Sequence, residues 1–255
     1  MTEVEVGTAG FDVEVLPDAA AVGRRAADIV AAAVAEKPDL VLAMPTGSTP
    51  LPMFEEIIAR VERGELDLSR VRLFCLDDYV GVTPDDPNSL TGWLRRVFIE
   101  PAGIPWANVR AAPADAPDPD AACIAYEADL AAAGGLDLAV LGLGPNGHIA
   151  YNEPGSAAET RTRTLDLTPE SIAQATAYWQ PGVSTPERGL TMGVGTLLES
   201  KRIVLIVTGG AKADILRRSL EGPMTADVPG SWLQLAAGKT TVVVDQGAAA
   251  GLSER

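Results

Sequence analysis

Short apolar runs alternate along this chain with longer, Ala-rich amphipathic stretches, and this alternation restricts its fold more than any other feature. Runs rich in Val, Leu and Ile are typical of strands buried on both faces of a parallel sheet, with helices between them. We expect strands at residues 11–16, 39–44, 71–76, 136–143, 202–207 and 240–244. We expect helices after an Asp18 N-cap to about residue 37, and at 51–63, 118–133, 214–220 and 231–237. The sequence therefore predicts an α/β fold, with a single open, mostly parallel sheet and helices on both faces.

The chain shows no internal repeat, long charge run or flexible linker that would divide it. A Pro-, Ala- and Asp-rich stretch at 111–119 could mark a boundary, but its composition is more typical of a surface loop. A length of 255 residues suits either one α/β domain or two small ones, so length does not decide. We therefore expect a single domain over residues 1–255.

Charge and composition argue against several classes of partner. The chain has 20 Lys and Arg against 35 Asp and Glu, a formal net charge of −15, whereas nucleic-acid binding relies on clustered Lys and Arg. No stretch approaches the ~20 uninterrupted apolar residues of a membrane span. The first residues lack the basic and apolar regions of a signal peptide, and two cysteines are too few for a disulfide scaffold. We predict a cytoplasmic protein that binds neither nucleic acid nor membrane.

Two Gly-containing loops follow predicted strands, where open α/β sheets place their ligands. After residues 39–44 comes PTGSTP at 45–50, which combines close backbone approach, three hydroxyls and the N–H groups of a helix N-terminus. After residues 202–207 comes TGGAK at 208–212, which adds the cation of Lys212. Both loops suit a phosphate. The alternatives are a Thr- or Ser-capped turn for the first and a solvated surface Lys for the second.

Two adjacent acids, Asp77 and Asp78, follow the strand at 71–76. Neighbouring side chains on a strand point to opposite faces, so at most one of the two enters a cleft. A carboxylate beside apolar Phe74 and Leu76 binds its proton more tightly and can act as a general base. The alternative for an acid at this place is to cap the following helix.

The loop at 142–155, GLGPNGHIAYNEPG, holds the only histidine, His148. Its first six residues match G-x-G-x-x-G, but dinucleotide binding requires a helix to start inside that motif. Pro145 stands where the helix would begin, and further breakers follow, so we reject this function. One His and two scattered Cys give no spacing typical of a metal site. The loop is thus read as a rigid turn that presents His148, with Glu153 five residues later.

At these residues the chain resembles the glucosamine-6-phosphate deaminase family, which is grouped with the sugar-phosphate isomerases and 6-phosphogluconolactonases. The similar segments are PTGSTP at 45–50, LDDYVG at 76–81, LGLGPNGHIAYNEPGS at 141–156, LTMGVGTLL at 190–198 and TGGAKA at 208–213. The resemblance implies a modified Rossmann-like fold. It also implies a cofactor-free conversion of a 2-amino-2-deoxy-hexose 6-phosphate and water to a ketose 6-phosphate and ammonia.

The resemblance assigns roles to particular residues of this chain. Asp77 is the expected base for proton transfer between C2 and C1, and His148 the expected acid/base group for opening the sugar ring. Glu153 is expected to orient or charge His148, with Asn146 beside it as a fourth catalytic candidate. The 6-phosphate is expected to bind the residues Thr46, Gly47, Ser48, Thr49 and Lys212. Family members range from monomers to hexamers, so a homo-oligomer is left open.

The chain departs from the family pattern at two places. Most members have an aspartate at the position of Asn146, and an amide cannot take a proton, so the ring-opening relay would rest on His148 and Glu153. Galactosamine-6-phosphate deaminase/isomerases are similar in having Asn-Gly-His here, which makes the C4 epimer an alternative substrate, giving tagatose 6-phosphate. Many deaminases also place a phosphate-binding arginine where this chain has SIAQATAYWQ at 171–180. Arg188 is a candidate replacement.

Two other functions stay open on the sequence. A 6-phosphogluconolactonase shares the Gly-His turn, but usually continues it with a Ser-Leu-Phe-Pro type segment, whereas this chain has Tyr-Asn-Glu-Pro. A non-catalytic sugar-phosphate sensor would keep the pocket and lose the chemistry, and Asn146 with the missing arginine would fit it. Ammonia release separates the deaminase from both.

Overall fold

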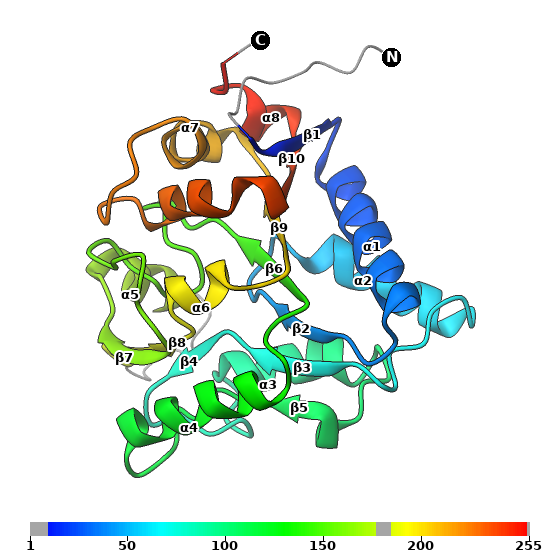
Figure 1. Cartoon of the computed structure of the whole chain (residues 1–255), viewed down its shortest axis with the longest axis vertical. Coiled ribbons are helices and arrows are strands. Elements are labelled where there is room, and N and C mark those ends of the chain that lie inside the picture. Colours follow the sequence, from blue (N-terminus) through cyan, green and yellow to red (C-terminus); the bar gives the residue numbers. More distant parts are fainter. Residues whose placement is uncertain (1–9, 177–184, 254–255) are drawn as a thin grey trace.

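A computed structural model describes residues 10–176 and 185–253, and its centre is a seven-stranded sheet (Figure 1). The strand order is β1-β10-β9-β6-β2-β3-β5, and all paired neighbours run parallel. The strands are β1 (Asp12–Leu16), β2 (Val41–Met44), β3 (Arg72–Cys75), β5 (Val109–Arg110), β6 (Leu138–Gly142), β9 (Arg202–Val207) and β10 (Thr240–Asp245). The six predicted strands are therefore confirmed, with the short edge strand β5 added.

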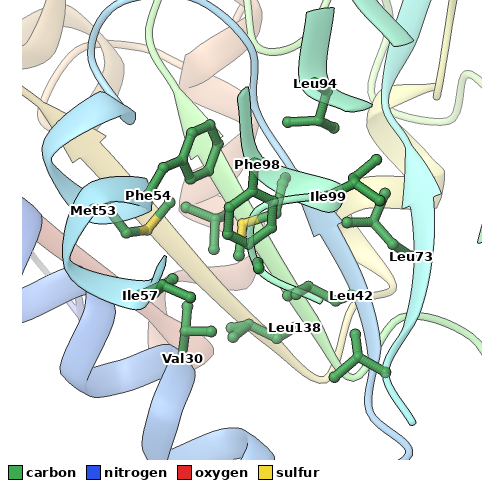
Figure 2. Close-up of a cluster of buried hydrophobic side chains, with 14 of the residues drawn as sticks. Val30, Leu42, Met53, Phe54, Ile57, Leu73, Leu94, Phe98, Ile99 and Leu138 are labelled. Carbon is green, nitrogen blue, oxygen red and sulfur yellow. The ribbon is translucent and has the colours of Figure 1, made fainter. Parts of the chain in front are cut away.

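Helices cover both faces of this sheet, as predicted. In Figure 1, α1 (Ala19–Glu36) and α2 (Leu51–Glu62) lie on one side, and α6 (Val194–Leu198) and α7 (Ala213–Leu220) on the other. Successive strand residues serve the two faces in turn: Leu42 packs with Phe54 and Ile57 under α2 (Figure 2), whereas Val41 belongs to the opposite core. Strands buried on both faces explain why the runs read as continuously apolar.

The predicted N-cap Asp18 is confirmed, and Asp118, expected as the first residue of the helix at 118–133, is also an N-cap. Asp18 accepts from the backbone N–H of Ala21, and Asp118 accepts from that of Ala121 at the start of α4 (Pro119–Ala132). The helix expected at 231–237 is instead a run of 3-10 turns, Pro229–Lys239, interrupted at Ala236. Pro229 and two glycines within this stretch leave too few residues for an α-helix to propagate.

A second, antiparallel sheet was not predicted. It pairs β4 (Asp77–Tyr79) with β8 (Arg188–Thr191), and β8 with β7 (Arg163–Asp166). These strands are three or four residues long and mix polar with apolar side chains, so they carry no periodic signal. The remaining elements are α3 (Leu90–Leu94), the π-helix Arg95–Ile99, the 3-10 turn Trp106–Asn108, α5 (Pro169–Thr176), the 3-10 turn Gly210–Lys212 and α8 (Gln246–Ala249).

The strand order alone indicates where a binding site lies. From β2 the chain goes to β3 and β5 on one side, and later to β6 and β9 on the other. The loops after β2 and β6 therefore leave in opposite directions, which opens a crevice at the carboxyl ends of these strands. Of the helices described, none combines the length and apolar character that a membrane crossing needs.

Candidate active site

A cavity of about 390 Å³ lies in this crevice, at the carboxyl ends of the central strands. The loops after β2, β3, β6 and β9 all contribute to its walls. Seven of the nine predicted site residues line it: Thr46, Gly47, Ser48, Thr49, Asp77, His148 and Lys212. The other two, Asn146 and Glu153, lie behind His148.

The loop after β2 leads into α2, so the N-terminus of this helix, the positive end of its dipole, lies at the cavity wall. No side chain in the described part of the chain caps this helix N-terminus, where the N-cap position is Pro50. The backbone N–H of Leu51 turns back to the Ser48 carbonyl at 3.3 Å. Gly47 has φ +93°, a conformation that favours glycine. The hydroxyls of this loop are therefore not used as helix caps, and the site suits an anion better than the capped-turn alternative does.

Lys212 brings a cation to the same cavity from the start of α7. Its Nζ donates to the Leu143 carbonyl at 2.8 Å, and burial lowers the pKa of its ammonium. The backbone of the preceding loop contributes less than predicted, because the Gly209 N–H donates to the Asp245 carboxylate at 2.9 and 3.0 Å. In this loop the side chain of Lys212, and not the Gly209 amide, faces the cavity.

The two adjacent acids separate as the strand geometry predicts. Asp78 accepts from the Ser89 hydroxyl and from the backbone N–H groups of Leu90 and Thr91, so it holds the start of α3. Asp77 points into the cavity instead and is 7% exposed. Burial, together with the charge of Asp78, raises the pKa of Asp77 to about 7. Asp77 thus has the proton affinity of a general base that works near neutral pH.

Two glycines shape the turn that presents His148. A Cβ at position 144 would lie 2.3 Å from His148 Nε2, so only glycine lets the imidazole pack on this backbone. Gly147 has φ +88° and would also clash with Val228 if it carried a side chain. The Gly144 N–H donates to the His148 carbonyl at 2.9 Å, which closes the turn. The Gly-rich motif is therefore explained by the placement of the histidine, not by a nucleotide.

Glu153 and Asn146 form a second layer behind the imidazole. Glu153 Oε2 lies 3.6 Å from His148 Nδ1 and accepts from Asn146 Nδ2 at 2.8 Å. Asn146 Oδ1 accepts from the His148 backbone N–H at 3.1 Å. Burial acts to raise the pKa of Glu153, but hydrogen bonding and the charge of His148 outweigh it, so the net pKa is lowered. Asn146 is placed to orient its neighbours rather than to touch a ligand.

Several cavity residues were not predicted. Tyr79 and Tyr151 share a 2.8 Å hydrogen bond between their hydroxyls on the wall near Asp77. Tyr79 lies in the segment LDDYVG, two residues after Asp77, and Tyr151 lies three residues after His148. This closeness in sequence could have identified both tyrosines as cavity residues. Ser171 and Ala175 of α5 also line the cavity. The departure from the deaminase pattern at 171–180 pointed to this segment, but to neither of these residues.

The candidate replacement for the missing arginine is not at the cavity. Arg188 lies on β8, donates to Thr164 Oγ1 at 2.9 Å and is not a lining residue. In the segment at 171–180, residues 177–180 lie outside the described ranges. Within those ranges, no group of three or more His, Cys, Asp or Glu could hold a metal ion.

Comparison with known proteins agrees with this arrangement. Residues 17–242 match the model of the glucosamine-6-phosphate isomerases/6-phosphogluconolactonase family. The chain belongs to this family. It is 40% identical to a glucosamine-6-phosphate deaminase from Cellvibrio japonicus, over 95% of this chain and 92% of that protein. It is 41% identical to one from Streptomyces avermitilis, over 95% and 93%.

Solved structures give the same family. A monomeric glucosamine-6-phosphate deaminase superposes with a TM-score of 0.90 at 33% identity, covering 94% of this chain and all of that one. The 6-phosphogluconolactonase from Trypanosoma cruzi superposes with a TM-score of 0.72 at 20% identity, over 96% and 98% of the two chains, which shows a shared fold. The family therefore includes two reaction classes on one fold, so the residues of the site decide which reaction a member catalyses.

Proposed function

We propose that this protein is an amino-sugar-6-phosphate deaminase/isomerase, which converts glucosamine 6-phosphate and water to fructose 6-phosphate and ammonia. The observation that carries the proposal is Asp77, a buried carboxylate that faces the cavity with a pKa of about 7. Proton transfer between neighbouring carbons needs such a base, whereas lactone hydrolysis moves no carbon-bound proton. The deaminase relatives at 40% and 41% identity support the same choice. We place the reaction in the cytoplasm.

The substrate's 6-phosphate is assigned to the Thr46–Thr49 loop, the N-terminus of α2 and Lys212. A phosphate dianion there favours the charged form of Lys212 and so opposes the effect of burial on its pKa. Binding this remote group supplies energy that positions the reacting carbons.

His148 is assigned to ring opening. It lines the cavity, and its Nδ1 faces Glu153, so Nε2 is the nitrogen left for the substrate. Opening moves a proton from the anomeric hydroxyl to the ring oxygen, and an imidazole can pass it on. Glu153 and Asn146 act through the imidazole and are positioning residues in this proposal.

Asp77 is assigned to the carbon chemistry. It takes the proton from C2 of the open-chain sugar and returns it to C1, while the amino nitrogen loses a proton and O1 gains one, so that the 2-amino aldehyde becomes a C1 alcohol with a C2 imine. Water then adds to the imine carbon and ammonia leaves, so that the ketose is formed. The reaction is thus an isomerisation coupled to hydrolytic deamination, and it needs no cofactor or metal.

Ammonia release from glucosamine 6-phosphate and galactosamine 6-phosphate, measured in parallel without added metal or nucleotide, tests the proposal. We expect glucosamine 6-phosphate to be preferred, because Asn146 lies behind His148 and does not contact the cavity. A preference for the C4 epimer would change the substrate but not the reaction class. If neither sugar yields ammonia and 6-phosphogluconolactone is hydrolysed, the lactonase is correct; binding without turnover would indicate a sensor.

A further inference from the structure

Three polar atoms around Glu153 are buried without a hydrogen-bond partner among the described residues. They are His148 Nδ1, Glu153 Oε1 and Ser171 Oγ. Buried polar atoms are nearly always paired, and an unpaired carboxylate oxygen is costly. Three such atoms together indicate a hydrogen-bond arrangement that is completed in solution.

The two oxygens of Glu153 lie in different surroundings. Oε2 accepts from Asn146 and faces His148, whereas Oε1 has no donor. A carboxylate only accepts hydrogen bonds, so the missing partner of Oε1 must be a donor. Ser171 is 4% exposed, and its hydroxyl is one of the groups that lower the pKa of the Glu153 carboxyl. Ser171 Oγ is a buried hydroxyl beside Glu153 with no other partner among the described residues, so it can supply this donor.

The Ser171 hydroxyl is not used to cap its own helix. In the first turn of α5, the Ser171 backbone N–H donates to Thr168 Oγ1 at 3.3 Å, so Thr168 and not Ser171 serves as the cap. Further along α5, Ala175 and Ile172 pack against Tyr79 and Leu167 in a small cluster separate from the two main cores. This packing holds α5 against the cavity, with Ser171 on its wall.

We propose that Ser171 is a positioning residue, whose hydroxyl donates to Glu153 Oε1 directly or through one water. Asn146 on Oε2 and Ser171 on Oε1 then hold the carboxylate from two sides, so that Oε2 faces His148 Nδ1. The inference rests on the proposed function for its effect on turnover. In this role Ser171 links α5 to His148 through Glu153, and it takes no part in the proton transfer between C2 and C1.

Kinetics of three variants test this role. Ser171→Ala removes the donor, Ser171→Thr keeps it, and Ser200→Ala is the matched control, because Ser200 Oγ is equally buried and unpaired but lies outside the cavity. For Ser171→Ala we expect kcat to fall about tenfold with KM changed less than about twofold. The acid limb of kcat should move to higher pH, because Glu153 loses a bond to its charged form. Ser171→Thr should restore both.

A second measurement needs no turnover. The chain has one histidine, so its imidazole NMR signals in the tag-free protein are unambiguous and report the charge of Glu153 3.6 Å away. The other titratable group coupled to Glu153 is Tyr151, whose pKa burial keeps well above its usual range. In Ser171→Ala the Glu153 inflection should move up by about one pH unit, and in Ser200→Ala it should not move.

The outcomes separate the two proposals. Superimposed titrations for wild type and Ser171→Ala would overturn the role of Ser171, whatever the enzyme does. A raised KM with unchanged kcat and pH profile would overturn it too, because Ser171 would then bind substrate directly. If no variant, wild type included, releases ammonia while the titration still shifts, the proposed function fails and the role of Ser171 stands. Should Ser171→Ala not fold, Ser171→Cys provides the same comparison with a much weaker donor.

Discussion

Asp77 and Asp137 are the same residue type with almost the same solvent exposure, 7% and 5%, yet the pKa values of their carboxyl groups shift in opposite directions. Asp77 follows β3 at the carboxyl edge of the sheet, and Asp137 precedes β6 at the amino edge. Burial and the charge of Asp78 raise the pKa of Asp77 to about 7. Burial also acts to raise the pKa of Asp137, but two lysines and a backbone N–H outweigh it, and the pKa falls to about 2.

The difference lies in the partners. Asp137 accepts from Lys37 Nζ at 2.6 Å, Lys201 Nζ at 2.7 Å and the Val41 N–H at 2.8 Å. Asp77 faces the cavity beside another acid. Burial alone therefore does not fix the charge of a carboxylate. At the amino edge of the sheet, lysine charges keep Asp137 ionised, whereas at the carboxyl edge Asp77 lacks such partners and binds a proton more readily.

The largest effect is expected for Asp77→Asn. An amide keeps the size of the side chain but cannot accept a proton, so ammonia release and isotope exchange at C2 should fall about a thousandfold or more. Exchange of the C2 proton with solvent deuterium, followed by NMR, is the direct measurement. Asp137→Asn is the matched control and should keep its turnover per folded molecule. Equal exchange in wild type and Asp77→Asn would remove Asp77 from the base role.

The same variant should be more stable than wild type. The folded-state pKa of Asp77 is raised from 3.8 to about 7, so the folded protein holds a proton that the unfolded chain has lost. Wild-type stability therefore falls as pH rises from about 4 to about 7, by at most about 4 kcal/mol, and Asp77→Asn lacks this fall. Urea unfolding should show the largest gain near pH 8 and almost none near pH 4. A gain that does not change with pH would contradict this account.

Asp137→Asn should behave in the opposite sense. Its pKa is lowered from 3.8 to about 2, so the carboxylate stabilises the fold above pH 4, and this contribution is lost as pH falls toward 2. The loss on substitution should be about 2 kcal/mol at pH 7, because the lysines lose their counter-charge and one of the two acceptor oxygens becomes an NH2 donor. Urea unfolding at pH 7 and pH 3 measures it, and the deficit should shrink at the lower pH. A deficit that grows on acidification would mean that the lysines contribute little.

The sequence predicted those features that depend on local pattern. Buried strands, Asp18 as an N-cap, and the separation of Asp77 from Asp78 follow from residue order alone. Other features depend on contacts between distant segments. In the second sheet, β4 pairs with β8 about 110 positions further along the chain, and these short strands carry no periodic signal. The family pattern pointed to the segment of Ser171 but not to the residue, and no motif marks the lysine pair on Asp137, so only the fold brings these groups to their partners.

The smallest effect is expected for Asn146→Asp, which would place a second carboxylate next to Glu153 behind His148. In Asn146→Asp, a carboxylate oxygen would replace the Nδ2 that now lies 2.8 Å from Glu153 Oε2. Two carboxylates at that distance cannot both be ionised at neutral pH, so they would share a proton, and the pKa of the pair would rise. The acid limb of kcat should therefore move to higher pH, with less than about a tenfold change at the optimum.

Both sugars should change together, because position 146 does not contact the cavity. Asn108→Asp is the matched control, since Asn108 donates to the Ser69 carbonyl, does not line the cavity and should leave the profile unchanged. Parallel pH profiles on glucosamine 6-phosphate and galactosamine 6-phosphate make the comparison. A tenfold change in their ratio would show that residue 146 sets sugar specificity, and its role in holding Glu153 would then be secondary.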